Sequence, residues 1–250
     1  MDLRIAGKTG LVTGASSGIG RGIALALGRE GVRLALSARR GDRLTELADE
    51  IEAAGGPRPA TVTADFLDPE APARIHAGAA EALGAVDILV NNAGGSRAFT
   101  LETGEEAWEE AMTLNFTRHR QLTQRAIPGM IEHGWGRIIN ITGKSEPEGI
   151  NGAFAAKAAV HSWSKGLSRE IGRHGITVNC VPPGRIMSEQ IERNYAPEYR
   201  ARQSAEEIPV GTYGDPADIA ELVCFLASPL ARYITGAVIP VDGGLRRYQF

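Results

Sequence analysis

Three glycines, Gly14, Gly18 and Gly20, follow a short apolar run and open a helical pattern, a spacing that can hold phosphate. Small residues let the backbone approach a pyrophosphate, and the first turn of a helix offers free N–H groups and a positive dipole end. Glycines alone are weak evidence, because an ordinary strand–turn–helix also uses them. We predict that this turn binds a dinucleotide through Gly14, Ser16, Ser17, Gly18, Ile19 and Gly20.

The end of the second predicted strand discriminates between nicotinamide cofactors. NAD enzymes usually have an acidic residue here, which accepts a hydrogen bond from the ribose 2′-OH. This chain reads Ser37-Ala38-Arg39-Arg40, without a carboxylate. Because a guanidinium binds phosphate through a planar fork, Arg39, with Arg40 beside it, suits the 2′-phosphate of NADP. We therefore predict NADP rather than NAD; a solvent-exposed arginine pair at a helix start is the alternative.

The elements that must position these residues alternate between apolar strand-like runs and helical patterns. The strand candidates are residues 10–12, 33–37, 60–64, 86–91, 137–142, 177–181 and 237–241. The helix candidates are residues 18–30, 42–54, 69–83, 107–132, 153–173 and 216–227. Repeated strand–helix–strand units with apolar strands form a parallel sheet covered on both faces, and right-handed crossovers make it doubly wound. The sequence predicts an α/β fold, a doubly wound parallel sheet (Rossmann-like) of about seven strands flanked by helices, in one domain over residues 1–250.

Residues 188–214 interrupt this alternation. The segment is polar and charged, contains Tyr195, Tyr199 and Tyr213, and lies between the sixth predicted strand and a later helix. In open α/β sheets, ligands bind at the carboxyl ends of the strands. We predict that residues 188–214 form a lid over a small-molecule substrate; a pair of solvated surface helices is the alternative.

Further motifs occur at matching distances along the chain. Asn91-Asn92-Ala93-Gly94 follows the fourth predicted strand, and Lys157 opens a long helical pattern. With the glycine turn, these motifs resemble the short-chain dehydrogenase/reductase family, from Gly7 to Gly244. The resemblance implies further cofactor contacts to adenine, ribose and nicotinamide. The implied residues are Asp65, Phe66, Asn91, Ala93, Gly94, Thr142, Lys157, Pro183, Gly184, Ile186 and Ser188.

The same resemblance implies a catalytic set of Asn, Ser, Tyr and Lys, of which half is present. Asn115 matches the asparagine that helps hold a proton-relay water, and Lys157 matches the lysine that binds the nicotinamide ribose and lowers the tyrosine pKa. The family tyrosine stands four residues before the lysine, where this chain has Ala153, and Gly143 occupies the serine position. Related enoyl reductases place the tyrosine seven residues before the lysine, where this chain has Ile150. The predicted catalytic residues are therefore Asn115 and Lys157.

Three interpretations of this site are open. In the first, an oxidoreductase acts on a carbonyl or alcohol with a different acid, since hydride transfer to a carbonyl leaves an alkoxide that some group must stabilise or protonate. In the second, the fold binds NADP(H) but catalyses elimination, isomerisation or C–C cleavage. In the third, the chain is a catalytically silent nucleotide-binding subunit. We favour the first, because redox chemistry is the commonest on this fold. The candidate acids are Lys144, Ser145, Glu146, a water relay from Lys157, and Tyr195, Tyr199 or Tyr213.

Composition limits the partners. The formal net charge is −3, and no strongly basic stripe suggests nucleic acid. No apolar run approaches the ~18 residues of a membrane span. The N-terminus lacks the apolar region of a signal peptide, so we expect a cytoplasmic location. Cys180 and Cys224 are isolated, and we expect two buried thiols rather than a disulfide or a metal site.

The helical patterns at 107–132 and 153–173 carry apolar residues on more than one face, including Trp108, Met112, Phe116, Trp163 and Leu167. One domain cannot bury all of these, and the resemblance points to a homotetramer, or a homodimer. We assign His161, four residues after Lys157, to that subunit interface. The tail 245–250 is expected to fray or to pack in an interface; docking over a neighbour's cleft, with Tyr248 as a phenol donor, is the alternative.

Overall fold

The computed structural model describes residues 1–143 and 149–246, so Lys144, Ser145, Glu146 and Tyr248 lie outside the described residues. Six parallel strands form one sheet in the order β3-β2-β1-β4-β5-β6. This confirms the predicted doubly wound α/β fold. The strands are β1 (Thr9–Thr13), β2 (Arg33–Ala38), β3 (Ala60–Thr63), β4 (Ile88–Asn91), β5 (Gly136–Ile141) and β6 (Ile176–Val181).

Helices connect the strands and cover the sheet. They are α1 (Gly18–Arg29), α2 (Gly41–Ala53), α3 (Ala71–Leu83), α4 (Glu105–Met112), α5 (Arg118–Glu132), α6 (Gly152–Ile171), α7 (Glu189–Asn194), α8 (Pro197–Glu207) and α9 (Pro216–Ala227). A π-helical turn, η1 (Thr113–Thr117), joins α4 to α5, and η2 (Gly172–His174) and η3 (Pro229–Ala231) are short 3₁₀ turns.

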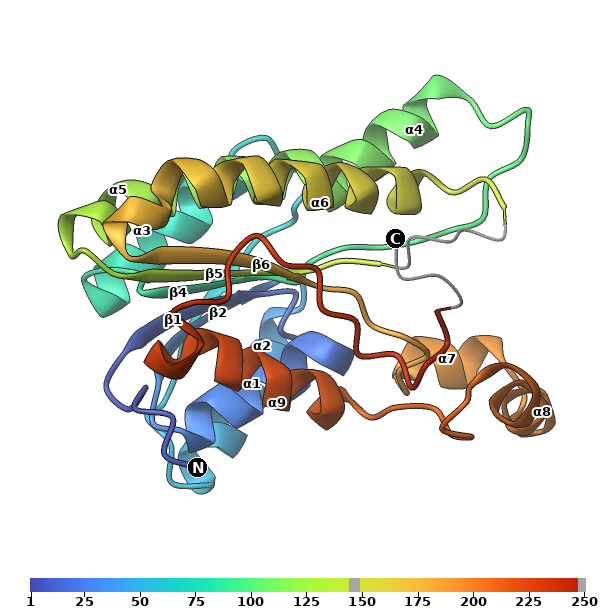
Figure 1. Cartoon of the computed structure of the whole chain (residues 1–250), viewed down its shortest axis with the longest axis horizontal. Coiled ribbons are helices and arrows are strands. Elements are labelled where there is room, and N and C mark those ends of the chain that lie inside the picture. Colours follow the sequence, from blue (N-terminus) through green and yellow to red (C-terminus); the bar gives the residue numbers. More distant parts are fainter. Residues whose placement is uncertain (144–148, 247–250) are drawn as a thin grey trace.

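The sheet lies between two helical layers, with α3, α5 and α6 over one face and α1, α2 and α9 over the other (Figure 1). Successive strand residues point to opposite faces, so Val12 joins the core with α1, α2 and α9, whereas Leu11 joins the core under α3 and α5. The free thiols of Cys180 and Cys224 are both buried, as the sequence predicted.

The seventh strand candidate, residues 237–241, runs beside β6 but forms only isolated bridges. Cys180 pairs with Val238, and Pro183 pairs with Val241, both in parallel orientation. Pro240 has no N–H to donate, and Pro183 interrupts the facing segment in the same way, so a continuous ladder cannot form.

The helix predicted over residues 107–132 is divided at η1. Asn115 lies in this π-helical turn, where its Nδ2 donates to Ala111 O at 2.9 Å and to Gly95 O at 3.0 Å. Such turns often occur at functional sites. The turn fixes the Asn115 side chain against the segment that follows β4.

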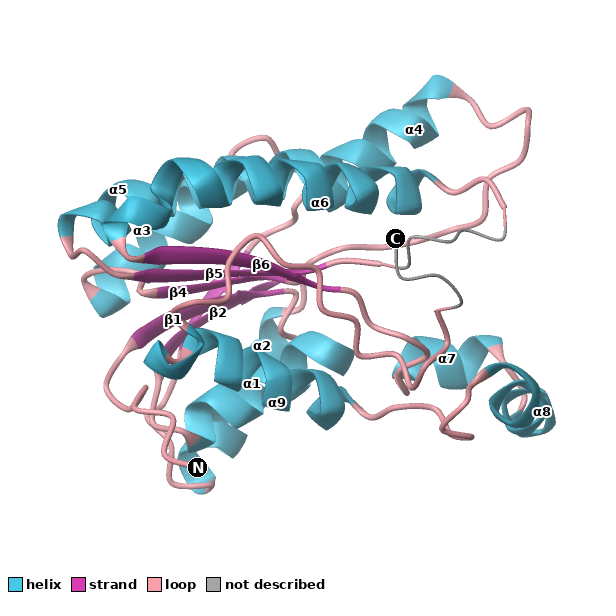
Figure 2. Cartoon of the chain, viewed as in Figure 1, coloured by secondary structure: helices cyan, strands magenta, loops and turns pink. Residues whose placement is uncertain are grey.

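The strand order reverses between β1 and β4, and ligands bind at such a switch point, outside the carboxyl ends of the strands. At this edge, loops leave the sheet toward α4 on one side and toward α7 and α8 on the other (Figure 2). The glycine turn follows β1 and the Asn91–Gly94 turn follows β4, so the fold brings both predicted motifs to the same edge.

Candidate functional site

A cleft of about 690 Å³ opens at the switch point. This volume is typical of pockets that bind cofactors and small molecules. Most of the residues predicted to contact a cofactor line it. These are Gly14, Ser16, Ser17, Gly18, Ile19, Arg39, Arg40, Asp65, Phe66, Ala93, Gly94, Ile186 and Ser188, together with the predicted catalytic Asn115.

The glycine turn is shaped for close backbone approach. Gly14 and Gly18 have φ values of 66° and 53°, which L side chains rarely adopt. A Cβ on Gly20 would lie 2.3 Å from Gly14 O, so Gly20 permits the turn to close and is not itself among the cleft-lining residues. Ser17, the N-cap of α1, makes no side-chain capping bond, which leaves the first N–H groups of α1 for a ligand. This cradle fits a dinucleotide pyrophosphate.

Basic and hydroxyl groups meet at the end of β2. Arg39 and Arg40 are exposed and line the cleft. Arg40 Nη2 donates to Ser16 Oγ at 3.3 Å, and Arg40 Nη1 lies 3.6 Å from a carboxylate oxygen of Glu189. The two guanidinium groups and the hydroxyl form a site that fits a phosphate monoester.

The turn after β3 forms the wall next to these arginines. Asp65 Oδ1 accepts a hydrogen bond from Leu67 N at 2.9 Å, which fixes the turn. The Phe66 side chain is buried and lies against the imidazole of His119, with 5.2 Å between ring centroids. Phe66 therefore anchors the turn from below.

Asn91 serves the sheet rather than the cleft. Its buried Nδ2 donates to Asn140 Oδ1 at 2.8 Å and to Thr123 Oγ1 at 2.9 Å, so Asn91 links β4 to β5 and α5. The neighbouring Asn92 donates through Nδ2 to Thr13 O at 3.0 Å and joins the ends of β1 and β4. We predicted Asn91 as a cofactor contact; the structure puts Asn92, not Asn91, on the cleft wall.

His119 supports the backbone of the cleft floor. Its Nε2 lies 2.7 Å from Ala93 O, and burial lowers the pKa of His119 to about 3. The imidazole is therefore neutral at pH 7, and Nε2 donates its proton to Ala93 O. The sequence offered no signal for this role beyond the helical spacing of His119 from Asn115.

Lys157 and Asn115 converge behind Gly94. A Cβ on Gly94 would lie 2.8 Å from Asn115 Oδ1 and 3.5 Å from Lys157 Nζ. Lys157 is buried, donates to Ile141 O at 2.8 Å, and has its pKa lowered by burial to about 8. It remains a cation at neutral pH. Lys157 is not among the cleft-lining residues, and it acts on the cleft from behind the Gly94 backbone.

Thr142 and His161 form a pair beside this lysine. His161 Nε2 lies 2.8 Å from Thr142 Oγ1, and burial, with the charges of Arg246 and Lys157, lowers the pKa of His161 to about 4. His161 is half-buried and its ring contacts Thr142 at the end of β5; its place in a subunit interface stays a prediction. Thr142 is buried and outside the cleft lining.

The position four residues before Lys157 faces the cleft. Ala153 lines the cleft in the first turn of α6, whose N-cap Asn151 accepts from Ala153 N at 2.9 Å. A Cβ on Gly143 would lie 3.7 Å from both Lys157 Cγ and Phe154 Cδ1, an ordinary contact distance. A Cβ at position 143 therefore fits without a clash, and position 153 borders the open cleft.

Only part of the segment after β6 lines the cleft. A Cβ on Gly184 would lie 2.5 Å from Asp242 Cα, so the Pro183–Gly184 segment packs on the returning chain and does not line the cleft. Ile186 and Ser188 do line it.

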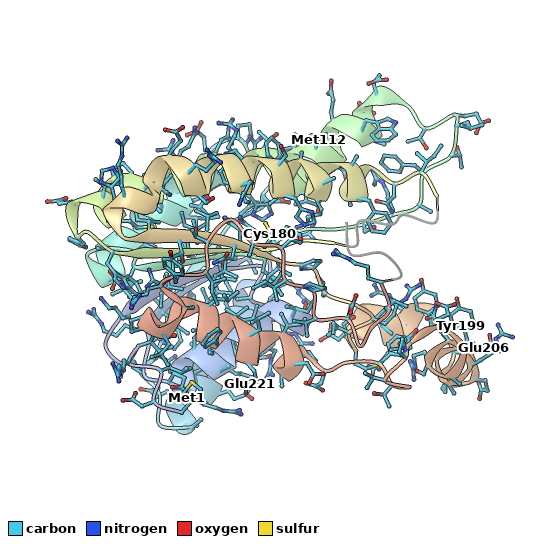
Figure 3. All side chains as sticks on the ribbon, viewed as in Figure 1. Met1, Met112, Cys180, Tyr199, Glu206 and Glu221 are labelled. Carbon is cyan, nitrogen blue, oxygen red and sulfur yellow. The ribbon has the colours of Figure 1, made fainter. Side chains whose placement is uncertain are left out.

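The tyrosines of residues 188–214 contact one another or a side chain of α8. Tyr195 and Tyr199 stack with centroids 5.2 Å apart, and Tyr213 donates to Gln203. Tyr199 lies on α8, well away from the sheet (Figure 3). None of the three tyrosines lines the cleft as the structure describes it.

Several lining residues were missed from the sequence. Ala111 precedes Asn115 by four residues, a helical spacing that a helical projection would have given, whereas Leu114 is adjacent to Asn115 and has no such signal. Arg97 and Glu110 form an ion pair at 3.2 Å between the β4 turn and α4, which no local pattern indicates. The missed residues are Ala38, Ala64, Leu67, Asn92, Gly95, Ser96, Arg97, Phe99, Glu110, Ala111, Leu114, Ala153, Glu189 and Arg193.

No cluster of three or more His, Cys, Asp or Glu side chains in residues 1–143 and 149–246 could hold a metal ion. Within the same ranges, no helix has both the length and the apolar character needed to cross a membrane.

Comparison with known proteins places this cleft in context. Residues 14–246 match the family model described as Enoyl-(Acyl carrier protein) reductase. The chain is 34% identical to the 3-oxoacyl-[acyl-carrier-protein] reductase FabG of Aquifex aeolicus, over 98% of this chain and 100% of that protein. Pseudomonas aeruginosa FabG is 36% identical, over 97% of this chain and 99% of that protein.

Comparison with solved structures identifies the same kind of protein as the sequence comparison does. L-sorbose reductase from Gluconobacter frateurii, complexed with NADPH and L-sorbose, superposes with a TM-score of 0.94 at 31% identity, covering 99% of this chain and 100% of that one. A 7α-hydroxysteroid dehydrogenase complexed with NADH and 7-oxo glycochenodeoxycholic acid gives 0.92 at 31% identity, covering 97% and 96%. The switch-point cleft, the glycine turn and these matches together show that the chain belongs to the short-chain dehydrogenase/reductase family of oxidoreductases.

Proposed function

We propose that this protein is an NADP(H)-dependent oxidoreductase that acts on a carbonyl or alcohol group and uses a proton donor other than the family tyrosine. The observation that carries the proposal is the convergence of Lys157 and Asn115 at Gly94: Asn115 and Gly94 line a cleft that fits a dinucleotide, and Lys157 lies behind the Gly94 backbone. The relatives named above act on acyl, sugar or steroid substrates by their names, so the reaction class is shared although the substrates differ.

The chain's own residues account for binding and orientation. The glycine turn and the open N-terminus of α1 bind the pyrophosphate, and Arg39, Arg40 and Ser16 bind the 2′-phosphate. Ser188 is available to the nicotinamide amide. When bound, NADPH supplies a hydride to a carbonyl carbon, and an oxyanion results. The role of the protein is then to stabilise and protonate that oxygen.

The positive charge of Lys157 is suited to stabilising this oxyanion. A cation in a site of low dielectric stabilises nearby negative charge more strongly than it would in water. Asn115 Oδ1 accepts from Gly95 N at 3.3 Å, so its orientation is fixed beside the lysine. A water held between them could carry the proton. This arrangement supports a relay that starts at Lys157. Tyr195, Tyr199 and Tyr213 do not line the cleft, and the other candidate acids, Lys144, Ser145 and Glu146, lie outside the described residues.

The substrate end of the cleft is bounded by α4, the β4 turn and the start of α6. Phe99 and Leu114 provide apolar surface, and Ser96, Arg97 and Glu110 provide polar groups. We propose a small polar organic substrate here, covered by residues 188–214 as the lid.

A steady-state assay tests the reaction class. Purified protein is mixed with NADPH or NADH and a panel of ketones and aldehydes, and cofactor oxidation is followed by absorbance. The proposal expects oxidation with NADPH and its loss in Lys157→Met, with Lys165→Met as the matched control, because Lys165 is exposed on the same helix. Binding of NADPH without oxidation of any substrate in either direction would contradict it.

A silent nucleotide-binding subunit is the second candidate, and Ala153 is the observation that favours it. The cleft faces a methyl group where the family has a phenol. Under this interpretation, NADPH binds but turnover appears only when an active homologue is added. Non-redox chemistry has no separate support in the described residues.

We also propose a homo-oligomer, a tetramer or a dimer. The five apolar residues of the α4–α6 region, Trp108, Met112, Phe116, Trp163 and Leu167, are each only half-buried in the single chain. Light scattering reports the mass directly.

A further inference from the structure

Arg40 has an anionic neighbour inside the cleft. Its Nη1 lies 3.6 Å from Glu189 Oε2, while its Nη2 donates to Ser16 Oγ. Arg40, Ser16 and Glu189 all line the cleft. The carboxylate of Glu189 therefore lies beside one of the two cleft-lining guanidinium groups that are available to a phosphate.

The position of Glu189 follows from the chain before it. Met187 N donates to Gly214 O at 2.8 Å, and a Cβ on Gly18 would lie 3.6 Å from Ser188 Cβ. The start of α7 is thus held over the glycine turn, on the far side of the cleft from the end of β2. Glu189 is the first residue of α7 and reaches across to Arg40 (Figure 1 shows where α7 and α8 leave the body).

A carboxylate beside Arg40 competes with a bound phosphate for the guanidinium. A phosphate monoester carries a charge of about −1.5 to −2 at pH 7. While Glu189 is paired with Arg40, the positive charge available to that phosphate is reduced. A cofactor with a free ribose 2′-OH has no such charge and does not compete for Arg40.

We propose that Glu189 is a cofactor-selecting residue, which competes with the 2′-phosphate of NADP(H) for the Arg40 guanidinium and so narrows the preference for NADP(H) over NAD(H). This rests on the proposed use of NADP(H). It assigns to the lid helix α7 a part in choosing the cofactor.

Isothermal calorimetry with NADPH and NADH tests the proposal without any turnover. The Arg40–Glu189 pair is exposed, with side-chain accessibilities of 44% and 61%, so a surface-type contribution is expected. Removing the competing carboxylate by Glu189→Gln should tighten NADPH binding by about 2–5-fold and leave NADH binding unchanged. The gain should shrink as salt is raised.

Two controls isolate the mechanism. Glu192→Gln makes the same charge change on an exposed residue of the same helix, outside the cleft lining, and should leave both affinities unchanged. In an Arg40→Ala background, Glu189→Gln should give no further gain, since the guanidinium for which the anions compete is gone.

Each other outcome overturns the proposal. An unchanged or weaker NADPH affinity in Glu189→Gln contradicts competition, and an equal gain in the Arg40→Ala background contradicts action through Arg40. Weaker NADH binding in Glu189→Gln would mean that the carboxylate instead accepts from a ribose hydroxyl. Failure of the wild-type protein to bind NADPH at all would contradict the proposed function instead, so the two failures are distinguishable.

Discussion

Installing a phenol at position 153 is the sharpest test of the proposed catalytic site. Ala153 faces the cleft one helical turn before Lys157, so a tyrosine there would extend toward the cleft. A serine at Gly143 would have its Cβ at 3.7 Å from Lys157 Cγ, which requires no movement of its neighbours. The added Cβ at position 143 is therefore accommodated, and the ring at position 153 borders open cleft volume.

The magnitude follows from general acid catalysis, which is worth roughly 10²–10⁴-fold, or about 3–5 kcal/mol of activation free energy. We expect Gly143→Ser with Ala153→Tyr to raise the kcat for simple ketones by at least about tenfold, less than the full factor because the phenol will not be ideally placed. The assay is NADPH oxidation under saturating cofactor, with NADPH affinity measured in parallel by calorimetry.

Gly143→Ser with Ala153→Phe is the matched control, because it keeps the serine and adds the ring without the hydroxyl. A gain in the tyrosine variant that the phenylalanine variant lacks identifies proton donation. Equal rates in the two variants, with NADPH affinity retained, would refute the reasoning. A wild-type kcat already near a typical ~10 s⁻¹ would also refute it, since another group would then fully replace the tyrosine.

Three further predictions follow from the same contacts. Arg39→Asp should reverse the cofactor preference toward NADH in calorimetry, since it exchanges a phosphate partner for a ribose hydroxyl acceptor. Gly20→Ala should abolish the binding of both nucleotides in the same titration, because its Cβ would lie 2.3 Å from Gly14 O and force the glycine turn open. Burial lowers the pKa of His119 to about 3 in the folded protein. Below pH ~6.5 the unfolded chain therefore binds a proton at this histidine that the folded chain does not bind. The free energy of unfolding should fall as the pH drops from 6.5 toward 3, by about 1.4 kcal/mol per pH unit. Urea unfolding between pH 4.5 and 7 should show a shallower slope for His119→Gln; an identical slope would contradict this assignment.

Local patterns in the sequence predicted the elements and part of the cleft lining. The alternation of apolar runs predicted all six strands that form the sheet. Gly14, Gly18 and Arg39, which line the cleft, were identified from the chemistry of the glycine turn and of the end of β2. Such features depend on neighbours within a few residues. The seventh strand candidate failed to form a ladder because Pro240 cannot donate, which its composition already indicated.

The rest depends on contacts between distant segments. Asn91 and Asn92 are adjacent, and only the pairing of β4 with β5 turns Asn91 into the sheet and leaves Asn92 on the cleft. His161 contacts Thr142, which lies 19 residues earlier, at the end of β5. Glu189 reaches Arg40 across the cleft from another part of the chain. The spacing of residues within a single helix or strand does not predict contacts between side chains of distant segments.

The electrostatics of Lys157 bear on whether the site is active or silent. Its folded pKa is about 8 against 10.5 for a free lysine, with burial as the main cause. At neutral pH it is charged in both states, so the fold carries an unfavourable buried cation that is relieved only as pH rises from about 8 to 10.5. The hydrogen bond from Lys157 Nζ to Ile141 O offsets part of this cost. A buried cation behind the Gly94 backbone, beside Asn115, is suited to holding a polar or negatively charged group of a ligand in the cleft. Both the oxidoreductase and the silent subunit have a use for such a cation, because the ribose of a bound nucleotide is also a partner for it, so turnover in the ketone assay, and not this charge, distinguishes the two.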